Sequence, residues 1–248
     1  MDRIERSEET YARLFGPRDV TVHEDDPELM EMLRGLIFGD IFSLGDLDDR
    51  TRELITVVLL ATQQTLPQLG AHVGAALNVG ITPLEVREAI YQCAPFIGFP
   101  KTLNALHVAN EVFTQRGIEL PLPSAATVGQ EERYDAGHAM QFPLYGNAMR
   151  ENLADLPGDW GQTVPRLLTE FCFGDLYTRT GLDVPTRELL VLAILVALGD
   201  APVQIFSHAI GNFQAGNSKE KLVAVIVHAF PYVGFPRAVN ALRIVKEL

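Results

Sequence analysis

The sequence predicts an all-α protein made of two tandem helical repeats that form one pseudo-two-fold body. Apolar residues recur at three- and four-residue spacing along almost the whole chain, which is the period of a helix buried on one face. Residues 66–112 laid on residues 202–248 share twelve identities, where unrelated segments would share roughly three at average residue usage. Because a repeat of this length far exceeds a solenoid unit, each half should be a small domain or half of one domain.

Capping signals mark where several of the expected helices begin. Thr82, followed by a proline and by Glu85, is a capping box that should open a helix running to about Cys93. Ser218 stands at the matching position of the second half and should cap the equivalent helix. Strand signals are almost absent, so the elements between these helices should be helical too.

Glycines and prolines mark the expected ends of helices in both halves. Gly80 and Gly216 should end the preceding helix in the left-handed conformation. Pro95 and Pro231 are expected to interrupt the following run. The Gly-Phe-Pro triplet that comes next in each half should form a tight corner before the last helix.

The chain divides at a stretch of prolines and small residues in its middle. We expect a first repeat over residues 1–116, a linker over residues 117–130 and a second repeat over residues 131–248. The acidic, proline-containing residues 16–28 should form a surface loop. The longest uncharged apolar run covers residues 189–198, which is shorter than the roughly 20 residues that cross a bilayer, so we expect a buried helix and no membrane segment.

Charge and composition exclude several classes of function. A net charge of −12 argues against nucleic-acid binding, which requires a basic surface. The polar, acidic start of the chain does not resemble a signal peptide and favours the cytoplasm. The two cysteines occupy non-equivalent places in the repeat, so neither a disulfide framework nor a cysteine-based metal site is expected.

One constellation that could carry chemistry occurs in both halves. A glutamate and a histidine stand on consecutive predicted helices, which could bring the two side chains face to face. A carboxylate hydrogen-bonded to an imidazole fixes its tautomer and raises its basicity, giving a general acid or base that works near neutral pH. A glutamine one turn before each histidine could orient a substrate carbonyl or carboxylate. The candidate catalytic residues are His72, Glu53, His208 and Glu188, and the candidate substrate-binding residues are Gln68 and Gln204.

A structural interpretation of the same residues stays open. Glu53 could pair with Arg50 or Arg52, and His72 could be a core histidine whose hydrogen bonds are satisfied. Arg52 and Arg187 could hold a carboxylate, but their place at the start of a helix favours surface ion pairs.

Other reactive or aromatic side chains are expected to be structural. No metal is expected, because His107, His138 and His228 lack a metal-ligand spacing. No cofactor is expected either. Cys93 and Cys172 lie on apolar helices and should be buried hydrophobes. Trp160 and Tyr145 could line a cavity, although single aromatic residues near a helix start are more often core.

Several stretches together resemble the carboxymuconolactone decarboxylase family. They are residues 38–42, 46–56 and 72–80, the Gly-Phe-Pro corner, and residues 169–175 and 181–183 of the second half. The resemblance implies the all-helical fold of the alkylhydroperoxidase D proteins, so that the chain would be two tandem alkylhydroperoxidase D-like repeats. It also implies assembly into trimers or hexamers, with a homotrimer favoured for a two-repeat chain, and loss of carbon dioxide from a carboxylated unsaturated lactone.

The chain departs from the family's redox members at two matching places. Those members carry a Cys-x-x-Cys motif, and here its positions hold Thr65 and Gln68 in the first half, and Ala201 and Gln204 in the second. Thiol peroxidase chemistry requires a thiolate nucleophile, so we exclude that branch. Decarboxylase members usually have glutamate where this chain has the two glutamines, which removes one candidate acid or base from each half.

The leading hypothesis is a cofactor-free lyase that acts on a small carboxylated lactone or a related unsaturated acid. A histidine would deliver a proton to carbon, the glutamate would orient it, and an apolar wall would strip water from the substrate carboxylate. The same groups could perform lactone isomerisation or cyclisation. The rival hypothesis is a non-catalytic helical oligomer or ligand-binding protein whose histidines are structural.

Overall fold

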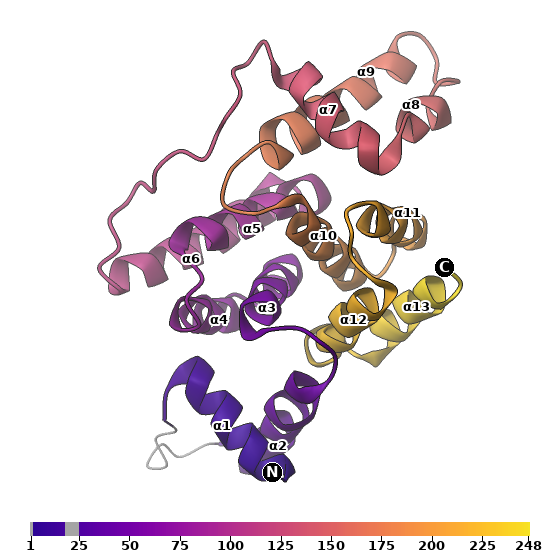
Figure 1. Cartoon of the computed structure of the whole chain (residues 1–248). Helices are drawn as coiled ribbons and strands as arrows, with labels where there is room; N and C mark the ends of the chain where they lie inside the picture. The colour runs from indigo at the N-terminus through magenta and orange to yellow at the C-terminus, as the bar shows by residue number, and fades with distance from the viewer. Residues whose placement is uncertain (1, 18–24) are drawn as a thin grey trace.

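The computed structural model describes residues 2–17 and 25–248, and within them every regular element is helical (Figure 1). Residues 18–24, which belong to the predicted surface loop, lie outside the described residues. The helices of the first repeat are α1 (Arg3–Phe15), α2 (Pro27–Arg34), the π-helical turn η1 (Gly35–Asp40), the 3₁₀ turn η2 (Ile41–Ser43), α3 (Asp49–Gln63), α4 (Leu66–Asn78), α5 (Pro83–Ile97) and α6 (Phe99–Gln115).

The second repeat ends in four helices that match α3–α6, which confirms the tandem all-α prediction, and it has one more short helix before its π-helical turn. Its helices are α7 (Arg133–Tyr145), α8 (Ala148–Asn152), α9 (Trp160–Leu168), the π-helical turn η3 (Thr169–Tyr177), α10 (Val184–Leu198), α11 (Pro202–Gln214), α12 (Lys219–Val233) and α13 (Phe235–Lys246). A π-helical turn therefore precedes the α3 hairpin, with η2 between them, and another precedes its α10 counterpart. Such turns are rare and often lie near functional sites.

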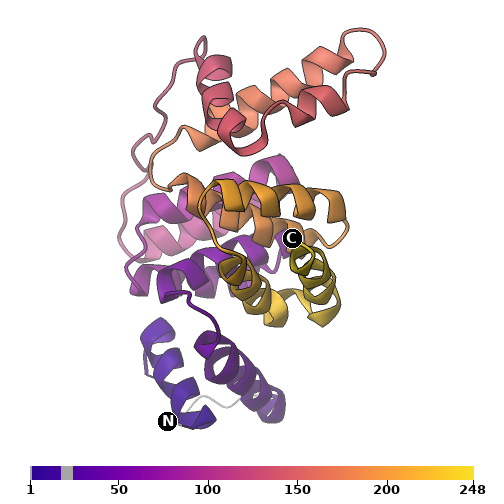
Figure 2. The same ribbon diagram turned by 45° about the vertical axis from the view of Figure 1, so that its right-hand side comes forward.

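The molecule has a central helical body with a smaller lobe at each end (Figures 1 and 2). Helices α3–α6 and α10–α13 form the body. One end lobe contains α1, α2 and η1, and the other contains α7, α8, α9 and η3. Each repeat thus contributes one lobe and half of the body.

The core of the body is the pair α3 and α10, which pack against each other. The apolar run at residues 189–198 lies in α10 and is almost wholly buried, as the sequence predicted. Helix α12 of the second repeat packs on α3, and α5 of the first repeat packs on α10. Because each central helix is covered by both repeats, the two halves share one hydrophobic core.

The capping predictions are confirmed. Thr82 and Glu85 form the reciprocal capping box of α5, and Ser218 accepts a hydrogen bond at the start of α12. Gly80 and Gly216 follow α4 and α11 with φ of +84° and +93°, a conformation that a side chain would strain.

The prediction that Pro95 interrupts its helix is wrong, and the same holds for Pro231. Both prolines lie inside the last turn of a helix, α5 or α12, which continues to the residue before glycine. A proline removes one backbone donor, and so close to a helix end few further bonds depend on it. The turn that ends each helix is made by Gly98 and Gly234, with φ of +78° and +80°.

The repeated Phe-Gly-Asp triplet attaches each end lobe's first helix to its π-helical turn. A Cβ on Gly39 would lie 2.7 Å from the carbonyl oxygen of Arg3, so only glycine allows this approach. Asp40 accepts a hydrogen bond from Arg3, Nε to Oδ2, at 2.8 Å. In the second repeat Asp175 pairs with Arg133 in the same way, Oδ1 to Nε, at 2.7 Å.

Residues 116–132 join the two repeats without helix and run along the outside of the body to α7 (Figure 1). The Arg87 guanidinium on α5 donates to the carbonyls of Leu122 and Pro123, at 3.2 and 2.9 Å, and holds this connection against the first repeat. Among the helices described, none is long and apolar enough to cross a membrane.

Candidate active sites

The first candidate site lies between the antiparallel helices α3 and α4, where Glu53 meets His72. The His72 Nδ1–H donates to Oε2 of Glu53 over 2.8 Å. Glu53 is fully buried and His72 is 8% exposed. The expected pairing across the hairpin is therefore present. The alternative pairing of Glu53 with arginine is wrong, because Arg50 binds Glu85 and Arg52 points to backbone carbonyls.

Aromatic rings close the first site on two sides. The His72 ring lies 5.3 Å from Phe15, at the end of α1, and 5.8 Å from Tyr232 on α12, measured between centroids. Burial raises the pKa of the Tyr232 phenol, and the negative charge of Glu53 raises it further. The phenol is therefore neutral and remains a hydrogen-bond donor at physiological pH.

Two polar atoms of this site are buried without a hydrogen-bond partner among the described residues. They are Oε1 of Glu53 and the hydroxyl of Tyr232. The Tyr232 ring remains partly accessible while its hydroxyl does not. Unpaired buried polar groups are costly and rare, so they mark places where a ligand or water completes the structure.

Arg52 is 1% exposed, so the prediction of a surface ion pair is wrong. Its guanidinium donates to the carbonyls of Leu47 and Leu44 at 3.0 and 2.7 Å and lies over the Phe42 ring. The start of α3 is covered by this turn and by α12, which the sequence of α3 does not reveal. Arg52 thus fixes the turn that precedes the site.

His228, on α12, belongs to a closed set of hydrogen bonds behind the first site. Its Nδ1 lies 3.4 Å from Arg52 Nη1, and its Nε2 lies 2.9 Å from the Thr56 hydroxyl, which itself donates to the Arg52 carbonyl. Burial holds the pKa of His228 well below its usual value, and the charges of Arg52 and His72 lower it further. His228 is therefore a neutral, structural histidine, as the sequence predicted.

The second candidate site pairs Glu188 with His208, but a phenol intervenes. The Tyr145 hydroxyl donates to Glu188 Oε2 at 2.5 Å and lies 2.7 Å from His208 Nδ1, while Nδ1 is 3.3 Å from the carboxylate. The Tyr177 hydroxyl donates to Glu188 Oε1, also at 2.5 Å. Both carboxylate oxygens are thus occupied. Burial, and then the charge of Glu188, raise the pKa of both phenols, so each keeps its proton.

Arg187 is fully buried as well, so the surface prediction fails there too. It lies 3.6 Å from Glu88 on α5 and donates to Gln92 at 3.1 Å. Glu88 also accepts from Arg179 at 2.7 Å. These bonds join the first repeat to the second. Arg52, which matches Arg187 in the first repeat, has no such carboxylate partner, because Ala224 stands at the position that matches Glu88.

Gln68 and Gln204 lie one helical turn before the histidines with exposed side chains. Within the described structure no hydrogen bond joins either glutamine to its Glu–His pair. The structure therefore brings four of the six predicted site residues into two pairs and leaves the glutamines outside.

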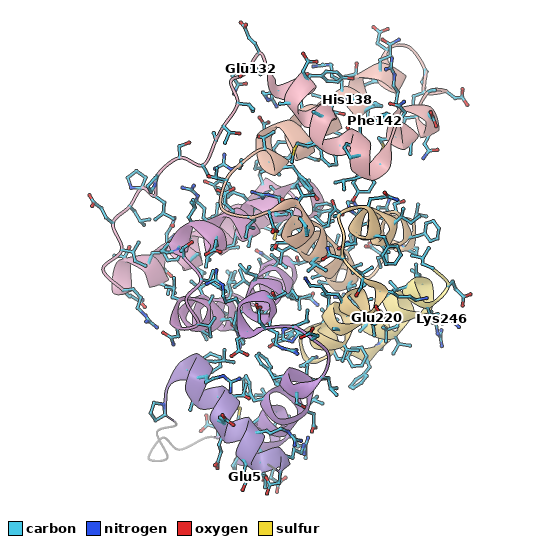
Figure 3. All side chains as sticks on the ribbon, viewed as in Figure 1. Glu5, Glu132, His138, Phe142, Glu220 and Lys246 are labelled. Carbon is cyan, nitrogen blue, oxygen red and sulfur yellow. The ribbon has the colours of Figure 1, made fainter. Side chains whose placement is uncertain are left out.

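Two further histidines, His107 and His138, lie away from both pairs. His107 is exposed and sits 3.2 Å from Glu111. His138 contacts Phe142 on α7, in an end lobe (Figure 3). The described residues contain no cluster of three or more side chains suited to hold a metal ion.

The cysteines are poor nucleophiles. Cys93 is fully buried, and burial strongly raises the pKa of its thiol. Burial, and then the charge of Asp175, raise the pKa of Cys172 to about 12. Both thiols stay protonated at neutral pH, as expected for hydrophobic positions.

Sequence reasoning missed the tyrosines. Tyr177 and Tyr232 stand where the other repeat has Phe42 and Phe96. At each of these matching positions only one repeat has a hydroxyl, and this difference in the sequence could have indicated that the two sites are unequal. Tyr145 was considered only as a core or cavity residue, because α1 and α7 share too little sequence to align it with Phe15.

Comparison with protein families finds a match in both repeats. The model of the carboxymuconolactone decarboxylase family matches residues 27–111 and 162–247. A 4-carboxymuconolactone decarboxylase of Acinetobacter baylyi is 29% identical over 125 residues, covering 49% of this chain and 90% of the relative. That relative therefore has about the length of one repeat.

Two further relatives give a similar picture. A nitrosuccinic acid decarboxylase of Metarhizium robertsii is 32% identical over 81 residues, which are 33% of this chain and 57% of that protein. A crystal structure of a proposed gamma-carboxymuconolactone decarboxylase subunit from Burkholderia xenovorans superimposes with a TM-score of 0.59 at 19% identity, over 100% of this chain and 97% of that one. The structural likeness shows that the two-repeat fold is shared.

Proposed function

The chain belongs to the carboxymuconolactone decarboxylase family, and from this membership and its Glu–His pairs we propose that it is a cofactor-free lyase. Its substrate would be a small carboxylated lactone or a related unsaturated acid, which loses carbon dioxide by His/Glu proton transfer. The observation that carries the proposal is the buried contact of His72 Nδ1 with Glu53 Oε2 at 2.8 Å.

The chemistry follows from the orientation of the imidazole. The Nδ1–H donates to the carboxylate, which leaves Nε2 as the ring nitrogen available to a ligand. When the bond to the substrate carboxylate breaks, carbon dioxide leaves and the electron pair moves into a conjugated carbonyl, giving an enolate. The protonated Nε2 of His72 then delivers its proton to carbon, and water later returns a proton to the ring.

The carboxylate of Glu53 serves this cycle in two ways. It fixes the tautomer of His72, and its negative charge stabilises the imidazolium before proton transfer. Burial of the pair supports the first step, because a substrate carboxylate that loses its water there becomes more ready to form neutral carbon dioxide.

The names of two relatives support the substrate class. One acts on 4-carboxymuconolactone and the other on nitrosuccinic acid. In both compounds an oxygen-bearing acceptor, a lactone carbonyl or a nitro group, can take up the electrons that carbon dioxide leaves behind. We propose Gln68 and Gln204 as substrate-binding side chains at the outer edge of each site, since both are exposed one turn before a histidine.

Carbon dioxide release tests the proposal. The purified protein is incubated with 4-carboxymuconolactone, with nitrosuccinic acid and with the same acids without enzyme. We expect release from at least one acid, and loss of release in the double variant His72→Ala/His208→Ala with its melting temperature kept. Turnover that survives in the double variant refutes the His/Glu mechanism. No release from either acid favours the non-catalytic, ligand-binding alternative.

We further propose that the chain assembles as a homotrimer. Large apolar side chains are exposed at matching places in the two end lobes: Leu29 and Met32 on α2, and Val164 and Leu167 on α9. Exposed apolar clusters of this kind are typical of subunit interfaces. Light scattering behind size exclusion should give three times the 27.4 kDa chain mass, and the monomer mass would contradict assembly.

A further inference from the structure

The two Glu–His pairs are unequal, and the inequality points to one working site. Resting on the decarboxylase function proposed above, we propose that the reaction takes place at the Glu53–His72 pair and not at the Glu188–His208 pair. Tyr232, supplied by the second repeat, donates a hydrogen bond to the substrate oxygen on which negative charge develops. The site is thus completed across the boundary between repeats.

The second pair lacks a free carboxylate oxygen. Tyr177 and Tyr145 each donate to one oxygen of Glu188 at 2.5 Å. Because the single proton of Tyr145 goes to the carboxylate, the His208 Nδ1–H donates to the phenol oxygen at 2.7 Å. Each oxygen of Glu188 therefore already accepts a phenol proton, and its direct contact with His208 is long, at 3.3 Å. This arrangement stabilises a packed core and makes the carboxylate a weaker partner for its histidine than Glu53 is for His72.

The first pair lacks both of these phenols. Phe15 and Phe42 stand where the second repeat has Tyr145 and Tyr177. Neither phenylalanine can donate a hydrogen bond, so Glu53 keeps a direct bond to His72 and its Oε1 remains without a partner although it is buried. The absence of two hydroxyls thus leaves a buried, unpaired acceptor beside the proton donor.

Tyr232 supplies the complementary donor. Its hydroxyl is buried, and its ring lies 5.8 Å from that of His72. Burial, and then the charge of Glu53, raise the pKa of its phenol, and the neighbouring Thr56 hydroxyl offsets part of this rise. Thr56 already donates its proton to the Arg52 carbonyl, so the Tyr232 hydroxyl has no hydrogen-bond partner of its own among the described residues. A neutral phenol in this place can donate to an oxyanion without losing its proton. In the second site the matching ring is that of Phe96, which lies 5.8 Å from the ring of His208. Phenylalanine has no hydroxyl, so the second site lacks this hydrogen-bond donor.

The packing of α12 holds Tyr232 in place. His228 lies one helical turn earlier, with its ring 5.6 Å from that of Tyr232, and is fixed by hydrogen bonds to Thr56 and Arg52 of the first repeat. A donor fixed before the reaction stabilises developing charge without having to reorganise. The Tyr232 hydroxyl can donate to an acceptor oxygen next to the reacting carbon, and Glu53 Oε1 can accept from an O–H group of the ligand. The site therefore favours a ligand that carries both groups.

The decisive comparison is Tyr232→Phe against Tyr145→Phe, because each variant removes one phenol hydroxyl from one site. The substrate is 4-carboxymuconolactone or nitrosuccinic acid, whichever the wild type decarboxylates faster. Tyr232→Phe should lower kcat about 10²-fold, the effect of losing one hydrogen-bond donor to an oxyanion. Tyr145→Phe should keep kcat near the wild-type value. Unchanged kcat in Tyr232→Phe, or an equal loss in Tyr145→Phe, overturns the inference while leaving the lyase function standing.

A second readout does not depend on turnover. In protein labelled with ¹³C at the histidine rings, 4-carboxymuconolactone should shift the NMR signal of His72 and leave that of His208 in place. The shift should weaken in Tyr232→Phe. A shift of His72 without carbon dioxide release would overturn the lyase function and keep the binding site, whereas a shift confined to His208 would overturn the assignment of the site.

Discussion

Replacing Glu88 with glutamine tests the buried ion pairs that join the two repeats. Glu88 has no exposed surface, and its carboxylate accepts from Arg179 at 2.7 and 3.0 Å, with Arg187 at 3.6 Å. It also accepts from its neighbour Arg87, at 3.2 Å. Glutamine keeps the shape of the side chain and removes its charge. The change therefore leaves Arg187, which is also fully buried, without any carboxylate.

The expected magnitude follows from these environments. Removing one partner of a buried ion pair costs about 3–5 kcal/mol. The Arg179 side chain is 15% exposed and can recover some hydration, so the lower end applies, about 3 kcal/mol of unfolding free energy. For a chain of 248 residues each kcal/mol lowers the melting temperature by about 2–4 °C, so Glu88→Gln should melt about 6–12 °C below the wild type.

Thermal unfolding followed by circular dichroism measures this shift. The matched control is Glu111→Gln, whose carboxylate pairs with His107 on the surface with more than half of both side chains exposed. Exposed pairs contribute little, so the control should melt with the wild type. If Glu88→Gln shifts no more than Glu111→Gln, the buried ion pairs do not hold the repeats together.

Two further substitutions probe the sites. Because burial, and then the charges of Arg52 and His72, hold the pKa of His228 below 6.5, the unfolded chain takes up a proton below pH 6.5 that the folded chain does not. Wild type should therefore lose about 1 kcal/mol more stability than His228→Gln between pH 6.5 and 5.5 in urea unfolding, and equal losses would contradict this. A Cβ on Gly211 would lie 2.3 Å from the Tyr145 hydroxyl, so Gly211→Ala should cost about 1–3 kcal/mol. The cost should be smaller in a Tyr145→Ala background, which also removes the ring carbons that would lie 2.5 and 2.7 Å from this Cβ, and equal costs would rule out that contact.

Much of the fold could be predicted from the sequence because its signals are local. The Thr82 capping box and the glycines with positive φ depend only on neighbouring residues, and the internal match gave the order of the helices. The burial of Arg52 and Arg187 could not be predicted in this way. Each guanidinium is covered by a helix of the other repeat, and no local pattern records that packing.

The candidate sites were predicted in part for the same reason. The Glu53–His72 contact joins adjacent helices of one hairpin, so spacing along the chain was sufficient. Tyr232 reaches that site from the other repeat, about 160 residues away in sequence, and Tyr145 reaches Glu188 from an end lobe. Their roles appear only when the two repeats are compared position by position in space.

The most direct test of the account is the rate of carbon dioxide release by His72→Ala and His208→Ala, each assayed alone on the acid that wild type decarboxylates faster. Removal of a general acid typically costs about 10²–10⁴-fold, and we expect a loss of this size in His72→Ala only. His208→Ala should retain turnover, with circular dichroism showing that both variants are folded. Full turnover in His72→Ala, or equal losses in both variants, would contradict a single active site in the first repeat.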